Sequence, residues 1–349
     1  MTSMKELAPV GLAWAERGVP APPPRAALRR SRPGSERYRL IEGDNIAALA
    51  ALREEFRSSV TLAYLDPPFF TGREHERLIR SRNPESGDIE RRYEAAFDDR
   101  WSGLAEYLEA LRDRVAATRD LLAPHGCLVL HVDPKTSHYA KVLCDEIFGP
   151  RCFASEIVWR YRRWPSKTRN FQRVHDVLLR YVRDPEQAPR FRQLYEPLAP
   201  STLVTWGDRK QRAVVDAQGR RRRSSRTSEP TPGTPLGDVW EIGIVAPVAR
   251  ERTGYPTQKP LALLQRLIEA CTDPDDWVLD PYLGSGTTMS ASGRLGRRSI
   301  GIDLNPEALS IARKRLWELR IAPLEQRVLA RPLRPARPAA QRARVSRVA

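Results

Sequence analysis

An acidic residue, two prolines and an aromatic residue, Asp66, Pro67, Pro68 and Phe69, directly follow the apolar run 60–65. The run predicts a buried strand, which places the four residues at its carboxyl end. The Asp66 carboxylate and the Pro67 carbonyl can accept hydrogen bonds from one NH2 group, while Phe69 offers a ring face to a flat molecule. A turn that merely ends the strand explains Asp and Pro equally well. The segment alone therefore predicts either a turn or a site for a planar substrate with an exocyclic amine.

A second strand-end segment lies far downstream, at residues 278–288. Its sequence, VLDPYLGSGTT, indicates a strand, an acidic residue and a glycine turn that enters a helix. Gly284 and Gly286 would let the backbone approach a ligand closely, and free helix N–H groups would face that ligand. The next expected strand ends at Asp303, which can accept two ribose hydroxyls. The combination predicts a site for an adenosine-bearing cofactor.

The spacing of these glycines differs from the dinucleotide fingerprint, and no P-loop lysine follows them. S-adenosylmethionine is the natural candidate, because its methyl group is already activated and the protein need only align a nucleophile with it. The four cysteines have no paired spacing, and the five histidines are scattered. We therefore expect no disulfide framework and no metal site, and we expect structural roles for the histidines.

The elements that position these residues are short β-rich runs alternating with helical segments. This pattern predicts an α/β fold, a Rossmann-like doubly wound and mostly parallel sheet with helices on both faces. Strands are expected at 38–41, 60–65, 127–132, 156–161, 177–181, 277–279 and 299–302. Helices are expected at 45–56, 103–122, 137–147, 260–271, 287–295 and 306–320.

Four stretches lie outside this alternation. Residues 71–100 are charged and lack clear periodicity, and 183–253 is expected to be an inserted target-recognition region. Residues 1–36, rich in Pro, Ala and Arg, are expected to form a flexible arm, and 323–349 a basic flexible tail.

The balance of 59 Lys and Arg against 43 Asp and Glu, a net charge of +16, points to a polyanionic partner such as nucleic acid. No apolar stretch approaches the roughly 20 residues needed to cross a bilayer, and the N-terminal residues lack the apolar region typical of a secretory signal. We therefore expect a cytoplasmic protein without a membrane partner.

Basic and aromatic residues interleave after residue 159, a mixture suited to phosphate contact and base stacking or, equally, to a strand edge with solvated arginines. The candidate DNA-binding residues are Arg160, Arg162, Arg163, Trp164, Lys167 and Arg169. Residues 219–226 could form a phosphate-binding loop or a disordered turn.

Three segments in order, 66–69, 255–260 and 280–288, resemble the site-specific DNA amino-methyltransferases of the β class. Further segments, at 97–101, 121–133, 145–149 and 175–181, are similar to the modification subunits of type III systems and related solitary enzymes. The resemblance covers about 38–320 outside the insert. It implies a circularly permuted order, with a catalytic half at 37–182 and an S-adenosylmethionine-binding half at 254–322.

The resemblance also implies residue roles. Asp280, Gly284 and Gly286 would line the methionine end of S-adenosylmethionine, in a tract with Pro281, Tyr282 and Thr287. Asp303 would hold the ribose, Asp44 and its neighbour Asn45 would lie near the adenine, and Thr257, Gln258 and Lys259 would approach the carboxylate. The target nucleotide would be rotated out of double-stranded DNA and stacked on Phe69.

An Asp at position 66 more often accompanies adenine methylation in such enzymes, which favours adenine N6 over the alternative, cytosine N4. A nucleic-acid-binding protein that keeps the fold without turnover is an alternative of another class. The chain departs from the family pattern at Phe70, where Asn is common, and at Tyr282-Leu283, where Phe-Cys is frequent. The resemblance is compatible with a homodimer, with a cognate restriction endonuclease encoded elsewhere and with association with the nucleoid.

Overall fold

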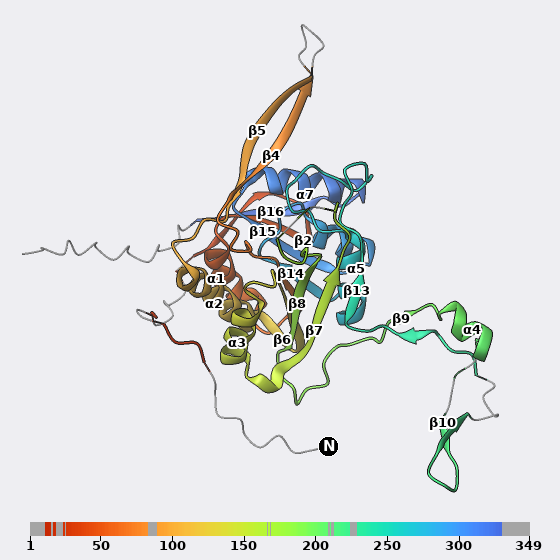
Figure 1. The fold of residues 1–349 in the computed structure, drawn as a ribbon. Helices are drawn as coiled ribbons and strands as arrows, with labels where there is room; N and C mark the ends of the chain where they lie inside the picture. The colour runs from red at the N-terminus through yellow and green to blue at the C-terminus, as the bar shows by residue number, and fades with distance from the viewer. Residues whose placement is uncertain are drawn as a thin grey trace, which may run out of the picture.

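The computed structural model describes residues 11–329 apart from 15–16, 19–23, 25, 83–88, 166, 168, 209, 211–212 and 224–228. Only the backbone is described at 77–82, 89–94, 205–206, 213–214 and 221–223. The centre of the molecule is a ten-stranded sheet in the order β1-β16-β2-β15-β14-β3-β6-β8-β7-β13 (Figure 1). Within the described ranges, no helix is both long enough and apolar enough to cross a membrane.

The middle of the sheet is parallel, as the sequence predicts. Its strands are β2 (Ser35–Glu42), β15 (Arg298–Asp303), β14 (Trp277–Asp280), β3 (Val60–Leu65) and β6 (Leu122–Val132). All six residues of β3 are buried, which fits a strand covered on both faces. Beyond β6, β8 (His175–Val182) runs antiparallel to its neighbours β6 and β7 (Phe153–Arg160).

Helices cover both faces of the sheet. On one face lie α1 (Asn45–Phe56), α2 (Leu104–Leu121) and α3 (Ser137–Phe148), and on the other lie α5 (Leu261–Cys271), α6 (Thr287–Arg294) and α7 (Pro306–Glu318). A short helix, η1 (Pro150–Cys152), follows α3. The bounds of the six predicted helices are confirmed to within two residues. The doubly wound architecture is therefore present.

Residues 71–100, for which the sequence predicts neither a strand nor a helix, contain two strands in the structure. β4 (Glu74–Arg82) and β5 (Ile89–Asp98) form an antiparallel hairpin that projects from the body of the molecule (Figure 1). Among the described strands, these two pair only with each other. Charged residues are frequent in both strands, so their sequence shows no regular alternation of apolar and polar residues.

Both chain ends contribute strands that the sequence did not predict. Part of the expected N-terminal arm is β1 (Leu28–Arg32), and part of the expected C-terminal tail is β16 (Pro323–Val328). β16 runs parallel to β2, and β1 pairs antiparallel with β16. The expected flexible arm and tail are therefore wrong for these residues, because backbone pairing incorporates them into the sheet. Residues 330–349 lie outside the described residues.

The expected insert is not wholly separate from the sheet. It contains β9 (Tyr195–Glu196), α4 (Pro200–Trp206), β10 (Ala213–Val215), β11 (Arg221–Arg223) and β12 (Thr234–Pro235), several of which stand away from the body (Figure 1). Its last strand, β13 (Val239–Glu241), pairs parallel with β7. Trp240 is buried there, at 4% exposure. The predicted insert, 183–253, therefore includes a strand of the main sheet.

Candidate active site

Two neighbouring parallel strands bring the two predicted strand-end sites together. β3 and β14 pair directly, so Asp66, just beyond the end of β3, and Asp280, at the end of β14, lie at one edge of the sheet. Residues of both tracts line one cavity of about 640 Å³. Segments more than 200 residues apart in the chain thus share a single pocket.

The Asp66 carboxylate presents one occupied and one free oxygen. Its Oδ2 atom lies 2.5 Å from Nζ of Lys259, whose side chain is only 10% exposed. Its Oδ1 atom is buried and accepts no hydrogen bond from any described residue. The same lysine nitrogen lies 5.0 Å from the centroid of the Phe69 ring. Pro67 and Pro68 also line the cavity. A buried acceptor oxygen therefore lies beside an aromatic ring, as the first motif predicts.

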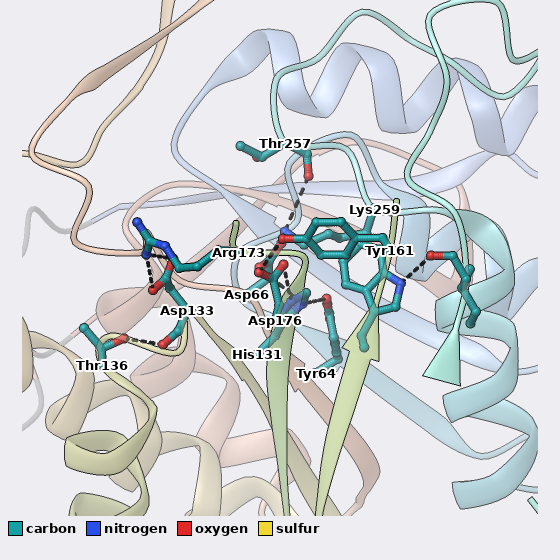
Figure 2. A network of polar contacts seen from close by, with 12 residues as sticks. Tyr64, Asp66, His131, Asp133, Thr136, Tyr161, Arg173, Asp176, Thr257 and Lys259 are labelled. Atoms are coloured by element: carbon teal, nitrogen blue, oxygen red, sulfur yellow. Dashed lines mark hydrogen bonds and ion pairs between the residues drawn. The ribbon is translucent and has the colours of Figure 1, made fainter. Parts of the chain in front are cut away.

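A buried network of polar side chains lies next to Asp66 (Figure 2). His131, at the end of β6, is fully buried, and its Nδ1 atom lies 2.7 Å from the Tyr64 hydroxyl and 3.6 Å from Oδ1 of Asp66. Its Nε2 atom lies 3.2 Å from Oδ2 of Asp176. The Tyr161 hydroxyl donates to the other oxygen of Asp176 at 2.9 Å. The expected structural roles for the histidines overlooked that His131 lies next to Asp66 of the 66–69 segment.

The network sets the protonation of its members. Burial would raise the pKa of Asp176, but the contacts with His131, the charge of Lys259 and the hydrogen bond from Tyr161 hold it below its usual value. Burial raises the pKa of Tyr64 well above its ordinary value, and nearby carboxylates add to the effect. Asp176 is therefore an anion and Tyr64 a neutral phenol at neutral pH.

The loop after Phe69 is held by a buried carboxylate, Asp99, for which the sequence alone predicts no role. Asp99, with no exposed surface, accepts hydrogen bonds from the backbone N–H groups of Phe70 and Thr71 at 3.0 and 2.7 Å. It also accepts from the Thr71 hydroxyl at 2.6 Å and from Nε1 of Trp101 at 3.0 Å. Phe70 has a φ of 56°, a conformation that few non-glycine residues adopt. The four donors to Asp99 hold this unusual turn in place.

The cofactor tract has the expected strand, turn and helix. Gly284 and Gly286 have φ values of 50° and 73°, and a side chain on Gly286 would place its Cβ atom 2.6 Å from Cβ of Ala312. Asp303 accepts hydrogen bonds from the N–H groups of Gly284 and Asn305, each at 2.8 Å. Burial raises the pKa of Asp303, while these N–H groups oppose the rise.

Asp280 is a strongly perturbed acid of the cavity. Burial raises its pKa to about 7, and the nearby charges of Asp66 and Asp303 add to the rise, although hydrogen bonds from Thr288 and from the N–H group of Tyr282 oppose it. A cationic ligand beside this carboxyl group would favour its ionised form.

Asp44 and Asn45 shape the rim of the cavity by holding α1 in place. Oδ1 of Asp44 caps α1 by accepting from the N–H groups of Ile46 and Ala47. The side chain of Asn45 donates to the carbonyl of Pro281 at 3.1 Å and accepts from Nε of Arg114 at 2.6 Å. Both predicted residues line the cavity, next to Pro281 and Tyr282.

The segment 257–259 connects the two tracts. Thr257 has a φ of 57° and lines the cavity, while the carbonyl of Lys259 accepts from the Thr287 hydroxyl at 3.1 Å. The Gln258 amide holds the preceding loop through Thr253 and the Glu251 carbonyl. Contact of these three residues with a cofactor carboxylate stays a prediction, since the ammonium of Lys259 is paired with Asp66.

The predicted DNA-binding residues lie at the same edge of the sheet, since β7 runs parallel to β3 and the 161–174 loop follows its end. Arg160 forms an ion pair with Glu241 of β13. Nη2 of Arg163 donates to the Tyr161 hydroxyl at 3.3 Å. Arg162, Trp164, Lys167 and Arg169 are exposed. The 219–226 segment lies partly outside the described residues.

The residues around the cavity fit S-adenosylmethionine. The left-handed glycine turn leaves its backbone accessible, and Asp303 has lone pairs left for two hydroxyls after accepting two N–H groups. Among the described residues, no group of His, Cys, Asp and Glu is arranged to hold a metal ion. Asp303 would hold the ribose, with Asp280 and the 284–286 turn toward the methionine end.

Comparisons with known proteins agree with this geometry. Residues 60–314 match the N6/N4 DNA methylase family model. The type II methyltransferase M.ScaI of Streptomyces caespitosus is 32% identical over 281 residues, which cover 79% of this chain and 80% of that protein. The DNA adenine methyltransferase YhdJ of Escherichia coli is 28% identical over 296 residues, covering 84% and 87%.

Among solved structures, the cytosine-N4-specific PvuII DNA methyltransferase superimposes with a TM-score of 0.50 at 16% identity, covering 82% of this chain and 90% of that one. This likeness supports the fold alone. The family model, which spans most of the chain, establishes the relationship. The chain belongs to the N6/N4 DNA methylase family, whose members are S-adenosylmethionine-dependent DNA methyltransferases.

Proposed function

We propose that this protein methylates the exocyclic N6 amine of adenine at a specific sequence in double-stranded DNA. The observation that carries the proposal is the free Oδ1 atom of Asp66, a buried acceptor without a hydrogen-bond partner among the described residues, beside the Phe69 ring. Leaving such an acceptor unpaired is unfavourable, so a donor of matching geometry is bound with a gain. The amine of a flat base supplies that donor.

The target amine is unreachable while the base is paired and stacked, so the nucleotide must leave the duplex. Phe69 then offers its ring face to the base, and Asp66 together with the Pro67 carbonyl accepts hydrogen bonds from the amine. These acceptors oppose delocalisation of the nitrogen lone pair into the ring, which makes the nitrogen a better nucleophile. Bound S-adenosylmethionine supplies an electrophilic methyl group. Lys259 balances the negative charge of Asp66 throughout.

The choice of adenine over cytosine N4 is supported by the acid at position 66 and by the naming of YhdJ as an adenine methyltransferase. The N4 specificity of the PvuII enzyme belongs to a protein only 16% identical to this one. A homodimer, a cognate endonuclease and nucleoid association stay predictions.

Expression of the chain in a host without DNA methylation, followed by modification-sensitive sequencing, tests the proposal. We expect N6-methyladenine at one short recognition sequence. Detection of N4-methylcytosine instead would overturn the choice of base, and an unmodified genome would overturn the proposed activity.

The Asp66→Ala variant tests the assignment of the amine site. We expect methyl transfer to fall by about 10²-fold or more, as when a single oxyanion-hole donor is removed, while cofactor affinity measured by calorimetry is kept. Asp120→Ala is a matched control, because Asp120 is a half-buried aspartate that pairs with Arg53 and does not line the cavity. An equal loss of cofactor affinity in Asp66→Ala would show that Asp66 serves the cofactor and not the amine.

A further inference from the structure

The loop of residues 161–174, between β7 and β8, is strongly basic. It contains no acidic residue. Its basic residues are Arg162, Arg163, Lys167, Arg169 and Arg173. A loop of this charge at the catalytic edge of the sheet is complementary to the phosphates of a nucleic acid.

Two aromatic side chains of this loop are almost fully exposed, Trp164 at 90% and Phe171 at 97%. The Gln172 amide donates to the Trp164 carbonyl at 2.8 Å. This hydrogen bond joins the part of the loop that carries Trp164 to the part that carries Phe171. An isolated exposed apolar residue needs no explanation, whereas two large rings on one short loop indicate an interaction surface. Neither ring contributes to the described hydrophobic core.

Both ends of the loop are fixed to the active site. The Tyr161 N–H group donates to the Val174 carbonyl at 2.8 Å, and the Tyr161 hydroxyl donates to Asp176, which contacts His131. At the other end, Nη1 of Arg173 lies 3.2 Å from both carboxylate oxygens of Asp133. Figure 2 shows Tyr161 and Arg173 to either side of Asp66 in that view. The loop that carries the two exposed rings is thus anchored at both of its ends to residues around the proposed amine site.

A base that leaves the duplex creates a gap in the stack and an unpaired partner base. Proteins that distort DNA commonly fill such gaps with apolar or aromatic side chains, since any base offers a face for stacking. We propose that Trp164 and Phe171 form a wedge that enters the duplex beside the target and stacks in the space that the flipped nucleotide vacates. This inference rests on the proposed function, because it requires a duplex substrate with an extruded base.

The surrounding charge favours DNA over a protein partner or a second copy of this chain. Apolar rings at a protein interface are normally surrounded by few charges at its centre. Here five described residues of the loop are cations and none of its residues is acidic. Two identical loops of this charge would repel each other.

The test compares methyl transfer in a single turnover on two duplexes with the same recognition sequence, once sequencing has defined it. In one duplex the target base is paired normally, and in the other it lies opposite an abasic site. We expect Trp164→Ala with Phe171→Ala to slow transfer on the paired duplex by about 10- to 100-fold. On the abasic duplex, where no pair must be broken, we expect a rate near that of the unmodified protein.

Two controls separate a wedge from simple DNA affinity and from surface aromaticity. Lys167→Ala should weaken binding to both duplexes alike and reduce the dependence of affinity on salt. Trp317→Ala, at a 54% exposed tryptophan on α7, should change neither rate. Fluorescence of 2-aminopurine at the target position reports extrusion directly, and it should fall in the double variant when binding is saturated.

Unchanged rates in the double variant, or equal losses on the paired and abasic duplexes, would overturn the wedge. Failure of the proposed function looks different, because the unmodified protein would then methylate adenine in neither duplex. Self-association through this loop would appear as a concentration-dependent increase in mass that the double variant loses, and would overturn the assignment to DNA.

Discussion

Replacing Asp99 with asparagine tests how the loop after the catalytic motif is held. The carboxylate accepts four hydrogen bonds, two at each oxygen: Phe70 N–H and Trp101 Nε1 at Oδ1, and the N–H and hydroxyl groups of Thr71 at Oδ2. Asparagine keeps the shape and one acceptor oxygen, but it turns an NH2 group toward the other pair of donors.

The magnitude follows from these contacts. A hydrogen bond to a charged acceptor contributes about 1.5–3 kcal/mol, and a buried donor left unpaired costs about 1–3 kcal/mol. The Thr71 hydroxyl can rotate to accept from the new NH2 group, so only the backbone N–H of Thr71 loses its acceptor. The remaining hydrogen bonds no longer have a charged acceptor. A total of about 3 kcal/mol would reduce the population of the closed loop by about 10²-fold. We expect methyl transfer to fall by a similar factor.

The assay is single-turnover methyl transfer by Asp99→Asn, with thermal unfolding measured in parallel. Asp98→Asn is the matched control, because the neighbouring carboxylate is exposed and bonded to Arg100. The control should leave the melting temperature and the rate unchanged. A rate for Asp99→Asn equal to that of the control, with unaltered stability, would refute the reasoning that Asp99 holds the catalytic loop.

Two further predictions concern the cofactor tract. The pKa of Asp280 is about 7 in the folded protein, above its ordinary value of 3.8, so burial of this acid favours folding most below about pH 4. That contribution is lost as pH rises to about 7. Over this window the free energy of unfolding of Asp280→Asn should exceed that of the unmodified protein by a growing amount, at most about 4 kcal/mol. A difference that stays constant with pH in denaturant titrations would refute this prediction. Gly286→Ala should lower the free energy of unfolding by about 2–4 kcal/mol, because its φ is 73° and its Cβ atom would lie 2.6 Å from that of Ala312. Gly296→Ala is the control: its φ is the same but no atom lies within 4 Å of its Cβ position, so its free energy of unfolding should fall by only about 1 kcal/mol. Equal thermal stability of the two alanine variants would contradict the packing argument.

The core elements could be predicted because their signals are local. Residues 60–65 are mainly apolar, as a strand buried on both faces requires. Asp44, a residue type that favours helix N-caps, directly precedes α1 in the sequence and caps it in the structure. The two strand-end motifs could also be assigned to one site, because the carboxyl ends of parallel strands meet at one edge of a sheet.

His131 and Asp99 could not be assigned their partners from the sequence. The contact of His131 with Asp176 exists because β6 and β8 pair, and its approach to Asp66 exists because β6 and β3 pair. Asp99 reaches Phe70 only after the β4–β5 hairpin has returned the chain to its starting point. The signals for such contacts lie in strand pairing and not in neighbouring residues.

β1 and β16 were missed for a different reason. Three of the six residues of β16 are buried, yet Glu325, Gln326 and Arg327 interrupt its apolar pattern. Backbone hydrogen bonds to β2 incorporate β16, and β1 then joins through β16. β1 is the edge strand, so one of its sides remains unpaired and tolerates charged residues. β16 is paired on both sides and carries the charged residues Glu325 and Arg327 at its less buried, alternate positions.

Asp303 and Gly284 lie at the ends of adjacent strands, and their hydrogen bond forms within the folded chain. The orientation of this acid is therefore settled by folding, before any nucleoside arrives. A ligand that finds its acceptor already oriented does not have to order that side chain, so less conformational entropy is lost on binding. The glycine turn is thus preorganised, and its stabilisation by a ligand should follow mass action alone, growing with the logarithm of the ligand concentration.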